Sequence, residues 1–261
     1  MDVIEEIIEY KRKDMFIKLI LNKSYKHIIR GYFKMNREDF VNKNVYIFLK
    51  GRLKKFSFEK EELSSIKGMS IDAFDLSKSF ISNDLKDLNY FENLEDLVLT
   101  NYMLDKPNIE IIENLKKITS IGFYNCEFKD VINLKGDYLK LADCKNIYKA
   151  NTEVFKNILI RNCDLDNLKF DNAENIIITN CRLTNELVLN QNIKKLTFEE
   201  MKIDDKIEQL IDKLKECNFK LIRCEYKNDD QKKKLKQLEN VKVIKNTFLT
   251  NDGIHEEEDT E

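Results

Sequence analysis

The sequence has few of the residues on which common enzyme sites depend. Its 261 residues include two histidines, six glycines and one proline, and tryptophan is absent. His27 and His255 lie far apart, in a predicted helix and in the carboxy-terminal tail, and neither stands beside a convincing nucleophile. The chain has no glycine-rich phosphate loop, no H-E-x-x-H and no G-x-S-x-G. We therefore expect a non-enzymatic protein that needs no cofactor.

Long apolar segments are also missing. The strongest hydrophobic run, VYIFL at 45–49, is far shorter than the roughly 20 residues that a membrane-spanning helix needs. Acidic residues stand at Asp2, Glu5, Glu6 and Glu9, where a secretory signal has a basic start and an unbroken apolar stretch. We expect no membrane contact and a cytoplasmic location, with the nucleus as the alternative. In either compartment the cysteines stay reduced.

Charge is distributed unevenly along the chain. Residues 10–55 contain fourteen Lys and Arg against three acidic residues, a net charge of +11, whereas the last ten residues carry six acidic side chains. With 42% hydrophobic and 35% charged residues, the composition is that of a folded protein with a well-solvated surface. We predict that residues 251–261 form a disordered acidic tail.

What the sequence does contain is a recurring pattern. The stretch NILIRNCDL at 157–165 returns as NIIITNCRL at 175–183. A template fits both stretches, with apolar residues at positions 1, 4, 6, 9 and 11, and position 9 recurs at intervals of 18, 19 and 18 as Cys126, Cys144, Cys163 and Cys181. The alternation at positions 4 and 6 is typical of a short strand. Recurrence every 18 to 28 residues over about ten copies is typical of a solenoid, in which each copy adds one strand to a parallel sheet.

This pattern resembles the leucine-rich repeat, L-x-x-L-x-L-x-x-N/C-x-L, over about residues 53–250. Four copies carry Cys at position 9, as in the cysteine-containing subclass of that family. The resemblance implies an α/β fold, a leucine-rich-repeat solenoid with a parallel β-sheet on its concave face. The first copy begins at Leu53, and the last one ends at Phe248.

The length of each copy predicts how the chain returns from one strand to the next. Between residues 118 and 193 the copies are only 18 to 20 residues long, so we expect irregular loops or single turns there. Longer returns toward both ends fit helices at 83–91, 108–117, 204–216 and 229–239. Residues 1–52 do not fit the template and have helical periodicity, so we expect them to form an α-helical cap over the first repeat.

Three roles are open to the repeated cysteines. A zinc site is usually built from close C-x-x-C pairs, which this chain lacks, and sulfurs on stacked strands would form a line instead of a tetrahedron. Disulfides between strands need Cβ atoms closer than parallel side chains bring them, and an oxidising compartment. We favour a buried column of thiols that lines a turn, because Met201, Phe74 and Asn246 occupy equivalent positions. No metal site is expected.

The outward-facing positions of the template suggest where a partner binds. In the leucine-rich repeat arrangement, positions 3, 5, 7 and 8 face outward on the concave sheet. The central copies place apolar and aromatic residues there, with one arginine and a rim of asparagines, as the centre of a protein interface favours. We predict partner contacts at Val98, Tyr124, Tyr138, Leu159, Arg161, Asn162 and Ile177. The alternative is that the apolar members serve strand propensity alone.

The same columns change character toward the carboxy terminus, where they become basic. They form a predicted patch for an acidic partner at Lys220, Arg223, Lys242 and Lys245. The function that we favour from the sequence is an intracellular protein-binding scaffold or adaptor.

Two alternative functions depend on the amino-terminal segment. Residues 13–29, KDMFIKLILNKSYKHII, resemble the second half of an F-box, although the opening Leu-Pro is missing and a tyrosine replaces the usual Trp. This resemblance implies a substrate receptor that docks on the adaptor of a cullin ubiquitin ligase through Met15, Leu19, Tyr25 and Ile28. Basic residues interleaved with aromatic ones also fit a ribosome- or RNA-associated factor. The residues in question are Lys11, Arg12, Lys13, Lys26, Arg30, Lys34 and Arg37.

Overall fold

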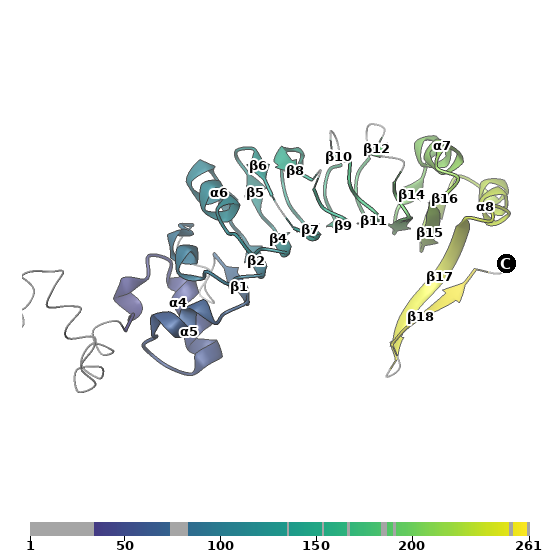
Figure 1. The fold of residues 1–261 in the computed structure, drawn as a ribbon. Helices are drawn as coiled ribbons and strands as arrows, with labels where there is room; N and C mark the ends of the chain where they lie inside the picture. Colours follow the sequence, from purple (N-terminus) through teal and green to yellow (C-terminus); the bar gives the residue numbers. More distant parts are fainter. Residues whose placement is uncertain are drawn as a thin grey trace, which may run out of the picture.

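The computed structural model describes residues 34–73, 83–134, 136–152, 154–165, 168–183, 187–189, 192–250 and 253–259. They form a mixed α/β structure around one sheet of ten strands (Figure 1). The strands cross the sheet in the order of the sequence, and every neighbouring pair is parallel except the last. Their bounds are β1 (Gly68–Asp72), β2 (Asp96–Thr100), β4 (Ser120–Tyr124), β7 (Tyr138–Ala142), β9 (Asn157–Arg161), β11 (Asn175–Thr179), β13 (Lys195–Glu199), β15 (Asn218–Ile222), β17 (Val241–Thr250) and β18 (Gly253–Glu258).

The parallel strands are aligned residue by residue. Ile158 of β9 stands opposite Leu139 of β7 on one side and Ile176 of β11 on the other. Ile160, two residues further on, is aligned in the same way and is also buried, because side chains two apart in a strand point to the same face. Positions 4 and 6 of the template are therefore buried strand positions, as predicted.

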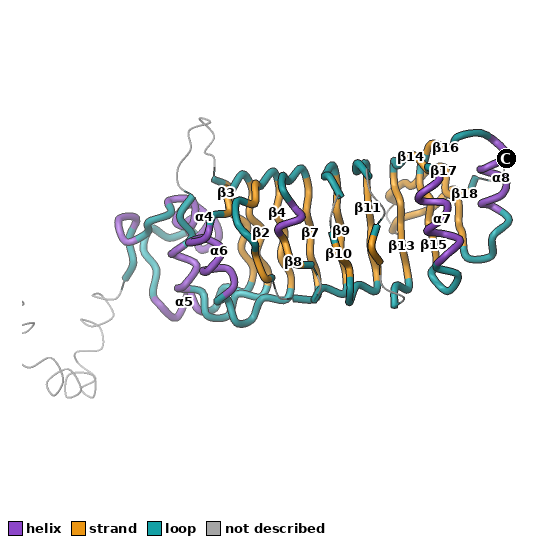
Figure 2. The backbone as a smooth tube through the Cα atoms, turned by 90° about the horizontal axis from the view of Figure 1, so that it is seen from above, coloured by secondary structure: helices purple, strands orange, loops and turns teal. Residues whose placement is uncertain are grey.

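A second set of short strands lies on the other side of the core. Figure 1 shows most of them along its upper side, whereas the long strands run along the lower side and stand side by side in Figure 2. Between the two sides, Phe155, Cys163 and Leu165 are at most 5% exposed. The short strands form four pairs, β3 (Met103–Leu104) with β5 (Glu127–Phe128), β6 (Ile132–Asn133) with β8 (Ala150–Asn151), β10 (Lys169–Phe170) with β12 (Val188–Leu189), and β14 (Lys202–Ile203) with β16 (Glu225–Tyr226).

The returns differ in length as predicted. Helices occupy three of the longer ones, α6 (Lys106–Glu113), α7 (Asp205–Lys213) and α8 (Asp229–Lys236), and each begins at an Asp or Asn whose side chain accepts backbone N–H groups. Residues 83–91, predicted as an α-helix, contain the 3₁₀ helix η3 (Lys86–Tyr90) instead, and the short 3₁₀ helix η4 (Ile147–Lys149) precedes β8. Across the described ranges, no helix is long and apolar enough to cross a membrane.

The amino-terminal end of the sheet is covered by helices. The 3₁₀ helix η2 (Arg37–Asp39) leads into α4 (Lys43–Leu53), which packs beside β1, and α5 (Lys60–Ser64) follows. Asn42, fully buried at the start of α4, donates to the hydroxyl of Tyr102 at 2.9 Å, and its backbone N–H donates to the carboxylate of Asp87 at 2.6 Å. Burial raises the pKa of Asp87. This polar network fixes the helices to the following strands.

The copy of the template predicted at Leu53 is wrong. Leu53 ends α4, Phe56 is 70% exposed, and Phe58 pairs with Met35 in an isolated antiparallel bridge. At position 8 of this copy the chain begins helix α5, whereas the copies from β2 to β15 turn sharply there, and within the described ranges residues 56–58 have no neighbouring strand of the sheet with which to pair. The helical cap therefore extends beyond residue 52, and the sheet begins at β1.

The carboxy-terminal segment is also different from the prediction, because its described part is not disordered. Gly253–Glu258 forms β18, which pairs antiparallel with the end of β17. The strand forms because its backbone completes the ladder of an edge strand and its carboxylates meet lysines, as described below. The prediction of a disordered tail over 251–261 was wrong for this strand.

The two faces of the long strands predict different costs of truncation. Ile160→Ala should lower the free energy of unfolding by about 2–5 kcal/mol, because it leaves a cavity in a fully buried row. Its neighbour Leu159, half-buried on the solvent-facing side, should cost about 1 kcal/mol or less when changed to Ala. Urea unfolding of both variants measures the difference, and equal losses would contradict the assignment of the faces.

Candidate partner-binding surface

Seven of the long strands, β2, β4, β7, β9, β11, β13 and β15, end in the same sharp turn. The residue at position 8 has a positive φ, for example 51° at Asn162 and 47° at Asn180. Asn and Asp adopt this left-handed conformation more readily than most residues. The backbone N–H of Asn162 donates to the carbonyl of Thr179 on the next strand at 3.1 Å, so the turn still continues the ladder. The equivalent residues are Asn101, Asn125, Asp143, Glu200 and Arg223.

The asparagine side chains at these turns bond to one another. The Asn180 amide donates to Asn162 Oδ1 and the Asn162 amide donates to Asp143 Oδ1, both at 2.8 Å. Asn125 and Asn101 continue the same arrangement in a second row that ends at the carboxylate of Asp72. Asn162, predicted to contact a partner, is exposed, and it is also part of this ladder along the carboxyl ends of the strands.

The cysteines at position 9 support the same turns from inside. The Cys144 thiol lies 3.3 Å from the carbonyl oxygen of Phe123 on the preceding strand and 3.2 Å from that of Ala142. A thiol is a weak donor, and here it serves carbonyls at the strand ends. All six cysteines are free. The interpretation as a buried column lining a turn is confirmed for Cys126, Cys144 and Cys163, whereas Cys181 is half-buried.

In the part of the chain that the structure describes, no three His, Cys, Asp or Glu side chains are grouped so that they would hold a metal ion. Burial raises the pKa of Cys163 to about 12 and that of Cys181 to about 11, which keeps these thiols protonated.

The predicted apolar contacts lie on the solvent-facing side of the ten-stranded sheet. Leu159 and Ile177 stand opposite each other on β9 and β11, and Ile177 is 38% exposed. Tyr138 of β7 is 52% exposed. Lys140 of β7, which pairs with Leu159, is exposed and interrupts the apolar column. The structure thus brings the central predicted residues onto one face without making it uniformly apolar.

The side chains of Val98 and Tyr124 both lie next to a glycine. Gly122 lies between them on β4, and a Cβ built on it would come within 3.2 Å of Cε2 of Tyr124 and 3.5 Å of Cγ2 of Val98. The ring of Tyr124 and the side chain of Val98 therefore both lie close to the Cα of Gly122, where a larger residue would be crowded. Arg161 is exposed on the same face, and its guanidinium lies 3.7 Å from the carboxylate of Asp143, a surface pair of little energy.

The predicted patch for an acidic partner is occupied by carboxylates of the chain itself. Arg223 contacts Glu199 at 2.5 Å and Glu200 at 2.9 Å, and Lys220 pairs with Glu256. Lys242 contacts Glu258 at 2.6 Å, whereas Lys245 is exposed. Lys220, Arg223 and Lys242 of the predicted patch therefore each already contact a carboxylate of the chain, and their binding of an acidic partner stays a prediction.

Sequence reasoning missed two further lysines of this end. Lys232 and Lys236 of α8 both contact the carboxylate of Asp259, at 2.6 and 3.0 Å. Hydrogen bonds from these lysines lower the pKa of Asp259, and the hydrogen bond from Lys220 lowers that of Glu256. The opposite charges of the last residues and of the last repeats were the signal that could have linked them.

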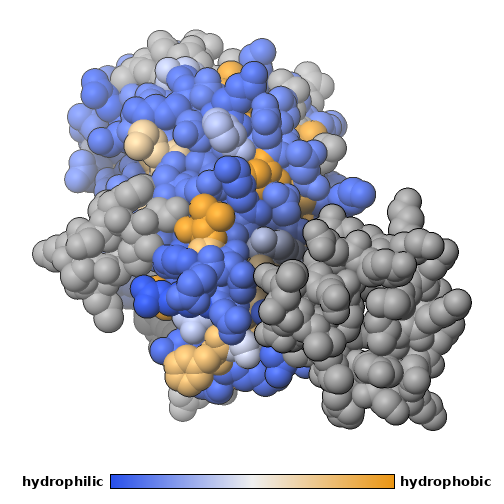
Figure 3. Space-filling view, turned by 90° about the vertical axis from the view of Figure 1, so that its left-hand side faces the viewer, coloured by the Kyte–Doolittle hydropathy of each residue, from blue (hydrophilic) through white to orange (hydrophobic). Residues whose placement is uncertain are grey.

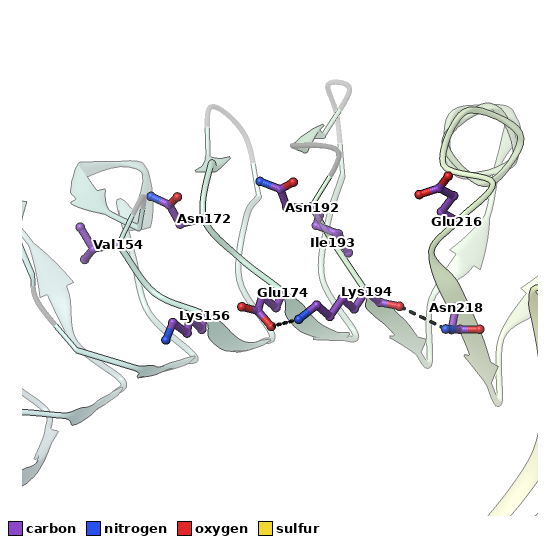
Figure 4. Close-up of a pocket in the computed structure, with 9 residues that line it drawn as sticks. All are labelled: Val154, Lys156, Asn172, Glu174, Asn192, Ile193, Lys194, Glu216 and Asn218. Atoms are coloured by element: carbon purple, nitrogen blue, oxygen red, sulfur yellow. Dashed lines mark hydrogen bonds and ion pairs between the residues drawn. The ribbon is translucent and has the colours of Figure 1, made fainter.

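A pocket of about 850 Å³ lies at the amino ends of the strands β9, β11, β13 and β15 (Figure 4). Lys194 contacts Glu174 at 2.6 Å there, and the Asn218 amide donates to the Lys194 carbonyl at 3.5 Å. The remaining lining residues are Val154, Lys156, Asn172, Asn192, Ile193 and Glu216. This lining combines amides, side chains of opposite charge and the apolar Val154 and Ile193.

The end of the molecule formed by the cap presents a different surface. Viewed from this end, the described residues are mainly hydrophilic, with separate hydrophobic groups (Figure 3). Val41, Ile47 and Phe56 are exposed there. The predicted adaptor contacts Met15, Leu19, Tyr25 and Ile28 lie outside the described residues, as do Lys11, Arg12, Lys13, Lys26 and Arg30 of the predicted RNA-binding set. Of that set Lys34 and Arg37 are described, and both are exposed.

Comparison with known proteins adds no assignment. No model of a protein family matches the sequence, and no curated protein matches it significantly.

Burial of the thiols predicts slow reaction with a thiol reagent. The thiolate is the reactive form, and thiols with a raised pKa supply little of it at pH 8. The folded protein should therefore release colour from an aromatic disulfide reagent slowly, and all six thiols should react at once in denaturant. Ile177→Cys, at an exposed position, provides a control that should react rapidly. Fast reaction of most native thiols would contradict the buried column.

Pairing of the carboxy-terminal carboxylates predicts a dependence on pH. The pKa values of Glu256 and Asp259 are lowered in the folded state. The two carboxylates therefore stabilise the fold fully above the ordinary carboxylate pKa of about 4, and this stabilisation is lost as pH falls through the lowered values. The amides of β18 should exchange faster with solvent below about pH 4, after correction for the intrinsic rate. A variant with Glu256→Gln and Asp259→Asn should lack this change, and equal protection of wild-type β18 at pH 7 and pH 3 would contradict it.

Proposed function

We propose that this chain is a leucine-rich-repeat solenoid that binds a protein partner on the solvent-facing face of its ten-stranded sheet. The regular spacing, the residue-by-residue alignment and the repeated left-handed turn support the repeat architecture. The resemblance in sequence to that family concerns the same positions. The protein acts in this proposal as a non-enzymatic scaffold or adaptor.

One observation carries the proposal for the binding face. Tyr138 and Ile177 are 52% and 38% exposed near the middle of an extended face, with Leu159 half-buried between their strands. Neither Tyr138 nor Ile177 contributes to the buried core, so strand stability alone does not require their size. Interfaces concentrate binding energy in such central aromatic and aliphatic side chains, surrounded by polar groups. The asparagine ladder and the charged ends of the sheet supply that polar surround.

The proposed binding face is bounded at both ends by other parts of the protein. In Figure 1 the cap helices α4 and α5 and the β17–β18 hairpin extend on the side of the long strands, and not on the side of the short ones. A partner lying on the long strands would therefore meet protein at both ends. The alternative functions, as an F-box receptor or an RNA-associated factor, remain predictions that rest mainly on residues before Lys34.

A pair of matched double variants tests the binding face. Tyr138→Ala with Ile177→Ala removes two exposed side chains from the proposed face. Tyr148→Ala with Val131→Ala removes similar side chains, 52% and 64% exposed, from the returns on the other side of the molecule. Partners recovered from native cells with tagged wild-type protein should bind the first variant at least 10-fold more weakly, a change of about 1.4 kcal/mol, and the second variant with unchanged affinity.

Thermal unfolding provides the control for this test. Both double variants should unfold close to the wild-type temperature, because all four side chains are exposed. Equal loss of binding in the two variants, or undiminished binding by the first, would contradict a binding face on the long strands.

A further inference from the structure

The carboxy-terminal strand presents carboxylates at alternate positions. In the pairing of β18 with β17, Glu256 stands opposite Thr247 and Glu258 opposite Ile244. Because side chains alternate along a strand, Glu256 and Glu258 point to one side and Glu257 to the other. Glu257 accepts a hydrogen bond from the amide of Asn246 at 2.8 Å. The acidic residues therefore form a spaced pattern along an extended segment.

The lysines that receive them come from three separate elements. Lys220 of β15 and Lys242 of β17 are aligned in register, and both contact Glu256. Lys242 also contacts Glu258. On α8, Lys232 and Lys236 are one helical turn apart and hold Asp259 between them. Lys220 and Lys242 thus match Glu256 and Glu258 in number, whereas two lysines of α8 share the single carboxylate of Asp259.

Lys220 and Lys242 continue the proposed binding face, whereas Lys232 and Lys236 belong to α8 on the side of the returns (Figure 1). Lys220 and Lys242 occupy position 5 of their copies, which Leu159 and Ile177 occupy in the central copies. The solvent-facing column therefore passes from apolar side chains at its centre to lysines at its carboxy-terminal end. A partner that follows the column would meet the lysines next, and β18 already covers them.

The covering strand is held by contacts that another strand can reproduce. β18 pairs with β17 alone and forms the edge of the sheet. The side chains of Lys220 and Glu256 are each 24% exposed, and those of Lys242 and Glu258 are 42% and 57% exposed. Ion pairs with this much exposure contribute little each and are screened by salt. An extended segment with the same acidic pattern would find the same backbone ladder and the same lysines.

We propose that the basic end of the sheet, made by Lys220, Lys242, Lys232 and Lys236 beside β17, is a binding site for an extended acidic segment of a partner protein. The partner segment carries carboxylates at alternate positions, and β18 occupies the site until the partner replaces it. This inference rests on the proposed function, since it specifies the chemistry of a partner on the same face. It concerns none of the residues that test the centre of that face.

The experiment uses the full chain and an acidic peptide of known sequence. The probe is a fluorescently labelled peptide with the sequence of residues 251–261, NDGIHEEEDTE. The receptor is the full chain with Glu256→Gln, Glu258→Gln and Asp259→Asn, in which the intramolecular strand has lost its charges. Fluorescence anisotropy should show at least 10-fold tighter binding of the peptide to this variant than to wild type, and the affinity should fall as salt rises.

Matched changes of charge identify the site. Lys220→Gln with Lys242→Gln, added to the neutralised chain, should abolish peptide binding. Lys140→Gln with Lys145→Gln removes the same charge from exposed positions outside the cluster and should leave binding intact. A peptide with Gln and Asn in place of the three paired carboxylates should not bind the neutralised chain.

Three results of the binding and folding measurements would overturn the proposal. The first is equal peptide binding by wild-type and neutralised chains, or binding that the Lys220 and Lys242 changes do not affect. The second is the absence of binding by the neutralised chain and also by a chain with Glu256→Lys and Glu258→Lys, whose own strand is repelled by the lysines. The third is loss of the folded circular dichroism spectrum in both chains, which would make β18 a required part of the fold.

A second copy of the chain is the competing occupant. If light scattering shows that the neutralised chain dimerises and that the peptide does not dissociate the dimer, the strand is exchanged between copies and the partner proposal fails. Failure in any of these ways leaves the test of Tyr138 and Ile177 unaffected, because neither residue touches the lysine cluster.

Discussion

The register of the parallel strands is the constraint on which the rest of the structure depends. From β1 to β15, each strand pairs with the next at equivalent residues, so the same template positions are aligned in rows. A shift of one residue would exchange the buried and exposed faces of a strand. This explains why Ile, Leu and Phe replace one another at positions 4 and 6, whereas the spacing between those positions does not change.

The turn that follows each strand from β2 to β15 preserves that register. A residue with positive φ at position 8 reverses the chain while its N–H still bonds to the next strand, and the thiol at position 9 supplies a weak donor for the carbonyl of the preceding one. Arginine and glutamate also adopt the left-handed conformation, at Arg223 and Glu200. The repeated Asn is thus favoured by its conformation and by the ladder that its side chain forms, and the fold accepts other residues where the ladder ends.

The positions of strands and buried rows were predictable from the sequence because they follow local spacing. Leu53, Phe56 and Phe58 show the limit of that reasoning, since they match the spacing and yet join a helix to a bridge with Met35. The spacing alone does not show whether a neighbouring strand is present for the segment to pair with. The contacts of the candidate site were less predictable, because Lys220 and Glu256 are 36 residues apart in sequence and meet only when β18 folds back.

Different interactions hold the segments that cover the two ends of the sheet. At the amino-terminal end, buried aromatic rings of Phe40 and Phe58 and the bonds of Asn42 fix the cap. At the carboxy-terminal end, partly exposed ion pairs hold β18. Packing and buried hydrogen bonds respond little to salt, whereas exposed ion pairs respond strongly. The second end is therefore the more easily changed by a charged partner.

Cross-linking between strands tests the register most directly. Lys140, Leu159 and Ile177 are aligned on three consecutive strands, about 5 Å apart from one strand to the next. With cysteines at Leu159 and Ile177, a short thiol cross-linker should join the pair efficiently, while the native thiols stay protected. Cysteines at Lys140 and Ile177, separated by a whole strand, should be joined poorly. Equal cross-linking of the two pairs, or none of the first, would contradict the register from which the buried core and the proposed binding face both follow.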